Sequence, residues 1–290
     1  MPTNRTTFRG RCFLCGFSST KGGITRHLKK HIAEYQGKTP LVWVRVTDQT
    51  PWNASGLSKA YWLDLEMPTY LTLAHLDEFL RAVWVECCGH LSRFFVRQGQ
   101  DEVMSFEHLS EDDLAEEEMV ALYKKDPKKL AQRVAREKGV SYAEAQKTLA
   151  LWALLYLNRP ERRDIHRTTL STLLKMTNKW EYEYDYGTTT HLHLKVMARY
   201  HGPKPPANAP IRILSRNYKP VIPCAECGQP ADYWEMDEGW PRPLCKRHIE
   251  ENDSEYYLPI VNSPRTGLCG YDSTASLDLT FEVYSPDKET

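Results

Sequence analysis

"LVWVRVTD", residues 41–48, alternates apolar and polar side chains and is rich in valine. This pattern predicts a β-strand with one buried face. Residues 60–67, "AYWLDLEM", predict a second strand. Residues 181–200 contain two further alternating arms around a bend at 185–187. The sequence therefore predicts enough strands to form a sheet around residues 41–48.

Helical patterns separate these strands. Thr72 is a suitable N-cap, and the apolar residues after it recur at three- and four-residue spacing up to Cys87, with Gly89 at the expected end. Residues 92–99, "SRFFVRQG", predict a return strand. Between residues 101 and 170 an acidic stretch and a basic stretch precede a helix, which begins with a Ser141–Glu144 capping box. Residues 101–170 therefore read as a helical insertion.

The predicted fold class is α+β, with a central mixed α/β core domain that carries a helical insertion and is flanked by two small zinc modules. A length of 290 residues suggests roughly two domains besides such modules. The predicted boundaries are 1–38 for a C2H2-like zinc finger, 39–100 and 171–220 for the two parts of the core, 101–170 for the insertion, 221–255 for a zinc knuckle, and 256–290 for a tail packing on the core.

Composition narrows the class of protein. The 38 basic and 38 acidic residues cancel, so no overall field draws the chain to nucleic acid or membrane. The N-terminus lacks the apolar stretch of a secretory signal, and no apolar run is long enough to cross a membrane. We therefore expect a cytoplasmic protein without membrane contacts. In that compartment CxxC pairs indicate metal or redox use more than disulfides.

The second of the two CxxC pairs predicts a structural zinc site. Its residues have the spacing C-x2-C-x17-C-x2-H: Cys224, Cys227, Cys245 and His248. Four protein ligands leave no coordination position for water, so such a zinc ion would hold the chain together and do no chemistry. The alternative interpretation is a set of unrelated buried thiols.

The first CxxC pair resembles that of a C2H2 zinc finger. Its residues have the spacing C-x2-C-x11-H-x3-H: Cys12, Cys15, His27 and His31. The two histidines are one helical turn apart, so both rings can face one ion. The spacer is one residue shorter than the common twelve, and the aromatic residue, Phe17, follows Cys15 by two positions. Two structural zinc ions are therefore expected in all.

The predicted finger is strongly basic. Residues 1–38 carry eight Lys or Arg residues and one acid, Glu34, a net charge of +7. Phosphate contacts are expected from Lys21, Arg26, Lys29 and Lys30. One finger covers only about three base pairs, so strong sequence specificity is not expected. The partner would be DNA, RNA or a nucleic-acid-bound protein, and the alternative is a basic protein-interaction module.

Two weaker groups of residues remain. The segment 87–90, "CCGH", could bind metal, but Cys87 falls on the apolar stripe of its helix and favours a core or helix-end role. Cys269 is either buried or an alternative ligand at the second zinc site. Asp185, His191 and His193 are weak catalytic candidates, because His191 and His193 share one face of a strand. An exposed β-hairpin would show the same alternation.

The segment "EYEYDYGTTTHLHLKV" resembles the signature of the plasmid ORF-3-like family of prokaryotic α+β domains through Asp185, Gly187 and His191. Thr188 and Thr190 stand where that family often has Asp and Trp. Residues 76–94, the ending after the zinc knuckle and the finger-like N-terminus resemble longer members. The resemblance implies an α+β fold and an association with mobile elements and plasmids, and it implies no defined activity.

The sequence thus predicts a zinc-containing binding module that contacts nucleic acid or a nucleoprotein partner through its basic N-terminal finger. The alternatives are a protein–protein adaptor, or a hydrolase or nuclease that uses Asp185 and His191. An enzyme is the less favoured reading, and the oligomeric state is left open.

Overall fold

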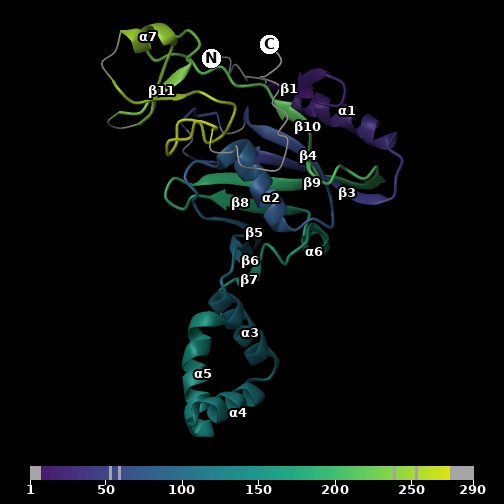
Figure 1. The fold of residues 1–290 in the computed structure, drawn as a ribbon, viewed down its shortest axis with the longest axis vertical. Coiled ribbons are helices and arrows are strands. Elements are labelled where there is room, and N and C mark those ends of the chain that lie inside the picture. The colour runs from purple at the N-terminus through teal and green to yellow at the C-terminus, as the bar shows by residue number, and fades with distance from the viewer. Residues whose placement is uncertain (1–7, 52–53, 58–59, 238–239, 252–253, 275–290) are drawn as a thin grey trace. The chain divides into compact units, whose positions relative to one another are not determined.

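The computed structural model describes residues 8–51, 54–57, 60–237, 240–251 and 254–274. The fold is α+β, as predicted: helices and strands form two compact units (Figure 1). The first unit combines Met1–Ser92 with Thr169–Thr290, and the second is Arg93–Thr168. Residues 1–7 of the predicted finger and 275–290 of the predicted tail lie outside the described residues.

A sheet of antiparallel strands forms the centre of the first unit. Its strand order is β2-β1-β10-β4-β3-β9-β8. The bounds are β1 Arg9–Cys12, β2 Ser18–Thr20, β3 Thr39–Asp48, β4 Trp62–Pro68, β8 Lys179–Tyr184, β9 Thr190–Gly202 and β10 Arg212–Asn217. The predicted strand 41–48 is β3, which pairs with β4 on one side and with β9 on the other. The predicted bend at 185–187 joins β8 to β9, which pair antiparallel.

Helices lie on both faces of this sheet. α1 (Lys21–Ala33) buries Ile24 and Leu28 against Trp43 of β3 and Leu214 of β10. α2 (Leu73–Leu80) lies on the opposite face, where Asp77 accepts a 2.8 Å hydrogen bond from the Tyr182 hydroxyl of β8. Alternation along the strands places the side chains of Trp43 and Tyr182 on opposite faces. The sheet is thus buried on both sides.

A buried carboxylate fastens α1 to the sheet. Asp64 of β4 is fully buried and accepts hydrogen bonds from the Trp43 indole at 2.7 Å and the Arg45 guanidinium at 2.8 and 2.9 Å. Ser215 of β10 donates a further bond of 2.5 Å to the same carboxylate. Arg45 also reaches α1 through the Thr25 hydroxyl at 2.9 Å. Every charge in this group is matched, as a buried ion pair requires.

The helix after Thr72 ends earlier than the sequence pattern predicts. α2 passes into a π-helical turn, Arg81–Val85, in which the Glu86 N–H bonds to the Arg81 carbonyl. A π-turn shifts the phase of the residues that follow it, so the three- and four-residue spacing no longer describes one face. Cys87 therefore lies beyond the helix, and its predicted place on the helical stripe is wrong.

A small sheet and a short helix follow β10, which itself comes after the proline-rich segment 203–210. The strands β11 (Tyr233–Glu235), β12 (Arg242–Leu244) and β13 (Tyr257–Pro259) pair in the order β12-β11-β13. Trp234, Leu244 and Leu258 form the core of this region, and α7 (Lys246–Glu250) follows β12. Beyond β13, residues of the tail such as Ser263 and Arg265 are buried in the first unit.

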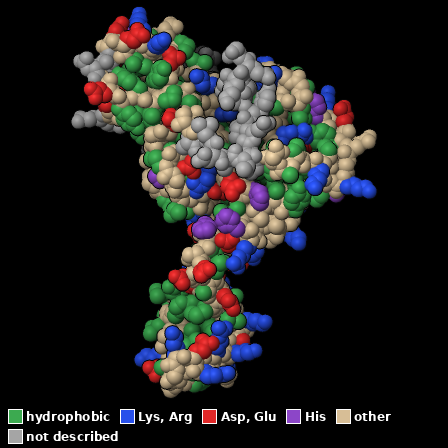
Figure 2. Space-filling model, in the orientation of Figure 1, with side chains coloured by type: hydrophobic (Ala, Val, Ile, Leu, Met, Phe, Trp, Pro, Cys, Tyr) green, Lys and Arg blue, Asp and Glu red, His purple; other side chains and the backbone are tan. Residues whose placement is uncertain are grey.

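The second unit contains strands as well as the predicted helices. β5 (Ser92–Gln98), β6 (Asp101–Glu107) and β7 (Glu161–Asp164) pair in that order, and β6–β7 is parallel. Its helices are α3 (Glu111–Lys125), α4 (Pro127–Lys138) and α5 (Tyr142–Tyr156). The helix that follows, α6 (Leu170–Met176), belongs to the first unit. Apolar side chains are exposed on the helical unit, among them Leu151, Leu154 and Leu155 of α5 (Figure 2).

The buried face of β4 predicts a large effect of shortening one side chain. Leu65→Ala should lower the free energy of unfolding by about 2–5 kcal/mol, because Leu65 is fully buried and its loss leaves a cavity. Urea unfolding of the full chain measures this change. Leu91→Ala is the matched control, because Leu91 is 69% exposed and should change stability little. Equal effects of the two substitutions would contradict the described core.

Candidate metal centres

The four predicted ligands of the N-terminal site meet in the structure. Cys12 ends β1, Cys15 lies in the turn after it, and the two histidines lie on α1. The Cys15 Sγ lies 2.9 Å from the His27 Nε2 and 3.3 Å from the His31 Nε2. All four donor atoms lie within 4.8 Å of one another. This set of two thiols and two imidazoles could hold a zinc ion.

The turn between Cys12 and Cys15 owes its shape to Gly16. Gly16 has φ +77° and donates its N–H to the Cys12 carbonyl at 2.8 Å. Only glycine adopts this left-handed conformation without strain. Phe17, which comes earlier than in the usual finger pattern, stacks on the His27 ring with 4.3 Å between ring centroids. The aromatic residue thus still supports a ligand, in spite of its displaced position.

The four predicted ligands of the C-terminal site also meet. Cys227 Sγ and Cys245 Sγ lie 3.8 Å apart, and the His248 Nδ1 lies 3.3 Å from Cys245 Sγ and 3.5 Å from Cys224 Sγ. Two thiolates on one tetrahedral zinc ion, each at about 2.3 Å from it, lie about 3.8 Å apart. Gly228 repeats the role of Gly16: its φ is +71° and its N–H bonds to the Cys224 carbonyl at 2.9 Å.

The electrostatics of the C-terminal site favour a thiolate. Burial opposes the charged form of Cys224, but hydrogen bonds from the backbone of Cys245, Cys227 and Glu226 and from the His248 ring lower its pKa to about 6. A thiol with this pKa is largely ionised at neutral pH. Zinc binds the thiolate form, so the backbone prepares this ligand for a cation.

Cys269 does not join the C-terminal site. It lies instead with Cys87, Cys88 and His90, and the four donor atoms again fall within 4.8 Å. The described residues thus include three Cys/His clusters that could hold metal ions, where the sequence predicted two sites. All eight cysteines are free and each belongs to one of these clusters. The signal for the third was weak because Cys269 is 179 residues from His90 along the chain.

Asp185, a weak catalytic candidate, is held by an ion pair. Its carboxylate accepts a 2.6 Å hydrogen bond from Arg265, whose side chain is fully buried, and a 2.5 Å bond from the Thr188 hydroxyl. Burial alone would raise the pKa of Asp185, but the bonds from Thr188, Arg265 and the Gly187 N–H hold this pKa well below its usual range. The carboxylate is therefore a permanent anion that neutralises Arg265.

The other two catalytic candidates, His191 and His193, meet a different carboxylate. Glu181 of β8 lies across from His193 in the β8–β9 register, and its Oε2 is 2.7 Å from the His191 Nε2 and 3.5 Å from the His193 Nε2. Sequence reasoning missed Glu181, although a hairpin bend at 185–187 would have placed it there. Three donors of this kind could hold a metal ion, although exposed acidic groups are also common without one.

The predicted phosphate-contacting residues divide into two groups. Arg26, Lys29 and Lys30 are exposed on α1. Lys21, at the start of the helix, is half-buried with its Nζ 5.1 Å above the Trp62 ring. Burial, aided by Arg45 nearby, lowers the pKa of Lys21. Lys21 thus already has an aromatic partner inside the protein.

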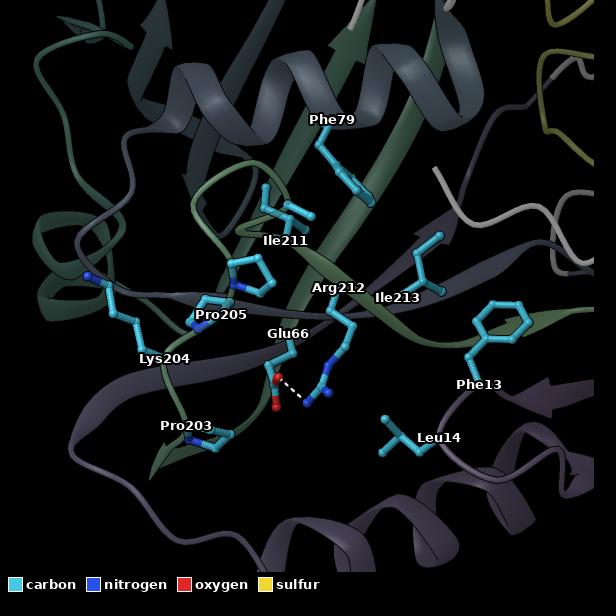
Figure 3. Close-up of a pocket in the computed structure, with 12 residues that line it drawn as sticks. Phe13, Leu14, Glu66, Phe79, Pro203, Lys204, Pro205, Ile211, Arg212 and Ile213 are labelled. Carbon is cyan, nitrogen blue, oxygen red and sulfur yellow. Dashed lines mark hydrogen bonds and ion pairs between the residues drawn. The ribbon is translucent and has the colours of Figure 1, made fainter. Parts of the chain in front are cut away.

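A pocket of about 380 Å³ lies beside the N-terminal site. Leu14 of the cysteine turn, Phe79 of α2 and the proline-rich segment line it, with the Glu66–Arg212 ion pair among them (Figure 3). Glu66 accepts a 2.5 Å bond from Arg212 and a 2.6 Å bond from the Tyr200 hydroxyl. Because the carboxylate is matched by these donors, the pocket offers a mainly apolar lining to a ligand.

Comparison with known proteins gives little further information. No family model and no curated protein matches the chain. A solved structure, described as a protein of unknown function, MM3350 from Methanosarcina mazei Go1, aligns with 10% identity over 58% of this chain and 65% of that chain, at a TM-score of 0.35. A TM-score this low assigns neither fold family nor function. Among the described residues, no helix has the length and apolar character of a membrane span.

The two predicted sites should each bind one metal ion. Cys15→Ser and Cys245→Ser each remove one thiolate from a four-ligand set, so each variant should lose one ion relative to the wild-type chain. Native mass spectrometry under reducing conditions counts the ions. Thr25→Ser is a control for changes on α1 that leave the ligands intact. A wild-type chain that carries no metal would contradict both sites.

Removing the Asp185 carboxylate should destabilise the fold. Asp185→Asn leaves Arg265 buried without its counter-charge and should cost about 3–5 kcal/mol. A carboxyl with a depressed pKa stabilises the folded state above its unfolded pKa of about 3.9, and this contribution is lost only as the pH falls through the folded pKa. Urea unfolding should therefore give the same loss at pH 6 and pH 8. Asp237→Asn is the control, because Asp237 is exposed. If Asp185→Asn is as stable as the wild type, the ion pair with Arg265 does not stabilise the fold.

Proposed function

We propose that this chain is a zinc-containing binding protein that contacts nucleic acid through the basic outer face of α1. The observation that supports this best is the division of α1 into two sides. Ile24 and Leu28 fix one side to the sheet, while Arg26, Lys29 and Lys30 project three positive charges from the other. Because the buried residues and the metal-site histidines of α1 both fix the helix in place, its exposed charges form one rigid patch.

The residues at the start of α1 do not favour sequence-specific contacts to base edges. In zinc fingers the residue before the helix and the third and sixth helical residues reach base edges. Here these positions are Thr20, Gly23 and Arg26. Thr20 caps the helix by accepting from the Gly23 N–H, and a Cβ on Gly23 would lie 2.1 Å from the Ser19 hydroxyl oxygen. Of the three positions, only Arg26 offers a long side chain.

Binding without base readout rests on phosphate contacts. Such contacts position a protein on nucleic acid and carry little sequence information. They release counterions, so their affinity falls as salt rises. The proposed activity is therefore sequence-independent and salt-sensitive, and it suits DNA, RNA or a nucleoprotein surface.

Two alternatives are distinguished by other residues. A protein–protein adaptor would use the same exposed surface for an acidic partner, and its complex would survive nuclease treatment. A hydrolase or nuclease would have to use His191 with Glu181, because Asp185 already neutralises Arg265. Membership of the plasmid ORF-3-like family is a proposal that rests on the segment 181–196 and on the further segments that resemble longer members, and it favours none of the three.

The basic patch can be tested directly. Replacing Arg26, Lys29 and Lys30 together by Ala should weaken binding of the full chain to a duplex of random sequence. The slope of log K against log salt should shrink by up to about 3, since each phosphate contact contributes about 0.9. Fluorescence anisotropy at several salt concentrations measures both quantities.

A matched control removes the same charge elsewhere. Lys128, Lys129 and Arg133 of α4 are also exposed, and their replacement by Ala should leave affinity and slope unchanged. If the α1 variant binds as well as the wild type, or if both triple variants lose affinity equally, α1 is not the contact surface. Binding only to an acidic protein would support the adaptor instead.

A further inference from the structure

We propose that Cys87, Cys88, His90 and Cys269 form a third metal site, which takes a zinc-like divalent ion and fastens the C-terminal segment to the end of α2. The inference does not depend on the proposed function, because it concerns neither α1 nor the basic patch. It is carried by the geometry of the four donors and by their surroundings.

The donors converge from two distant segments. His90 Nε2 lies 3.2 Å from the Cys269 Sγ, and the Cys88 Sγ lies 3.8 Å from the Cys269 carbonyl oxygen. With Cys87, the four donor atoms all lie within 4.8 Å of one another. Three sulfur atoms and one imidazole nitrogen are a donor set for tetrahedral zinc. No disulfide joins these cysteines.

The backbone at this cluster repeats that of the other two. In each CxxC turn, the second cysteine is followed by a glycine in the left-handed region: Gly16 after Cys15 and Gly228 after Cys227. At the third cluster Gly89 follows Cys88 with φ +70°, and Gly270 follows Cys269 with φ +69°. Four cysteines thus share one local arrangement, which turns the chain sharply behind a sulfur ligand.

Cys269 itself also adopts an unusual conformation. Its φ is +46°, a left-handed value that costs a residue with a Cβ of order 1 kcal/mol or more. Folding tolerates such a conformation where a further interaction at the same residue offsets it. Coordination of the Cys269 sulfur by a cation supplies such an interaction.

Two neighbouring side chains, Arg265 and Tyr184, hold residues of the cluster in place. The guanidinium of Arg265 is fully buried, and its Nε and one Nη each lie 3.3 Å from the Cys87 Sγ. Arg265, whose charge is paired with Asp185, thus also donates to the sulfur of Cys87 and holds this donor in place. The Tyr184 hydroxyl accepts from the N–H groups of Cys87 and His90, both at 3.3 Å, and so fixes the backbone of two ligands.

The site would be structural. Four protein ligands leave no position for water, as in other closed zinc sites. Its effect would be to close the long loop between residues 90 and 269, and with it the segment that places Arg265 beside Asp185. Loss of the ion should therefore loosen the tail without disturbing the two other clusters.

Native mass spectrometry of the full chain under reducing conditions tests the proposal. The wild type should carry three ions, and Cys88→Ser and Cys269→Ser should each carry two. Cys88 is exposed, so its variant should still fold. The double variant Cys88→Ser/Cys245→Ser should carry one ion. His193→Ala controls for metal at the Glu181–His191–His193 group and should keep three.

Cobalt substitution gives a second readout. The wild-type chain reconstituted with Co²⁺ should show stronger thiolate-to-cobalt absorption than Cys88→Ser, because a site with three thiolates is lost in the variant. Two ions in the wild type with no change in Cys88→Ser or Cys269→Ser would overturn the proposal. Three ions that persist in both variants and fall to two in His193→Ala would overturn it as well.

Discussion

Crowding of sulfur and nitrogen donors is the constraint on which this structure depends. At three places in the described part of the chain, four Cys and His donor atoms lie within 4.8 Å of one another. Thiolates at such distances repel one another unless a cation lies among them, and thiols packed this way gain little from each other. A divalent ion turns this repulsion into a cross-link and couples its binding free energy to folding.

Each cluster brings together residues from segments that are separate in the sequence. The first holds α1 against β1, where the Asp64 network continues the attachment into β3, β4 and β10. The second holds α7 to the turn before β11, beside the Trp234 core. The third joins the end of α2 to the C-terminal segment. With a metal ion bound, each cluster would cross-link short segments that bury little apolar surface on their own.

The sequence predicts the local features of this arrangement well and the distant ones poorly. The strands β3 and β4, the β8–β9 hairpin and the α+β class follow from alternation and β-branched content, and the two CxxC sets follow from spacing. Cys269 and His90 could not be joined from the sequence, because only tertiary folding brings residues so far apart together. The π-turn at 81–85 could not be predicted either, because the apolar residues on both sides of it continue the same spacing.

The same limit explains the candidate catalytic residues. Asp185 looked available because it sits at a hairpin bend, but its partner Arg265 is supplied by the tail, 80 residues further along the chain. Glu181 was overlooked because its proximity to His191 depends on the cross-strand register and not on spacing within one strand. The exposure of Arg26, Lys29 and Lys30 on α1 agrees with their predicted role in phosphate contact. Lys21 differs, because it is half-buried over the Trp62 ring.

Anomalous X-ray scattering from crystals of the full chain tests the central claim most directly. Data collected on both sides of the zinc absorption edge locate each ion without any substitution in the protein. The account predicts one peak at the centre of each of the three Cys/His clusters, with four protein ligands around it. Clusters without peaks, or cysteines joined in disulfides at those positions, would contradict it.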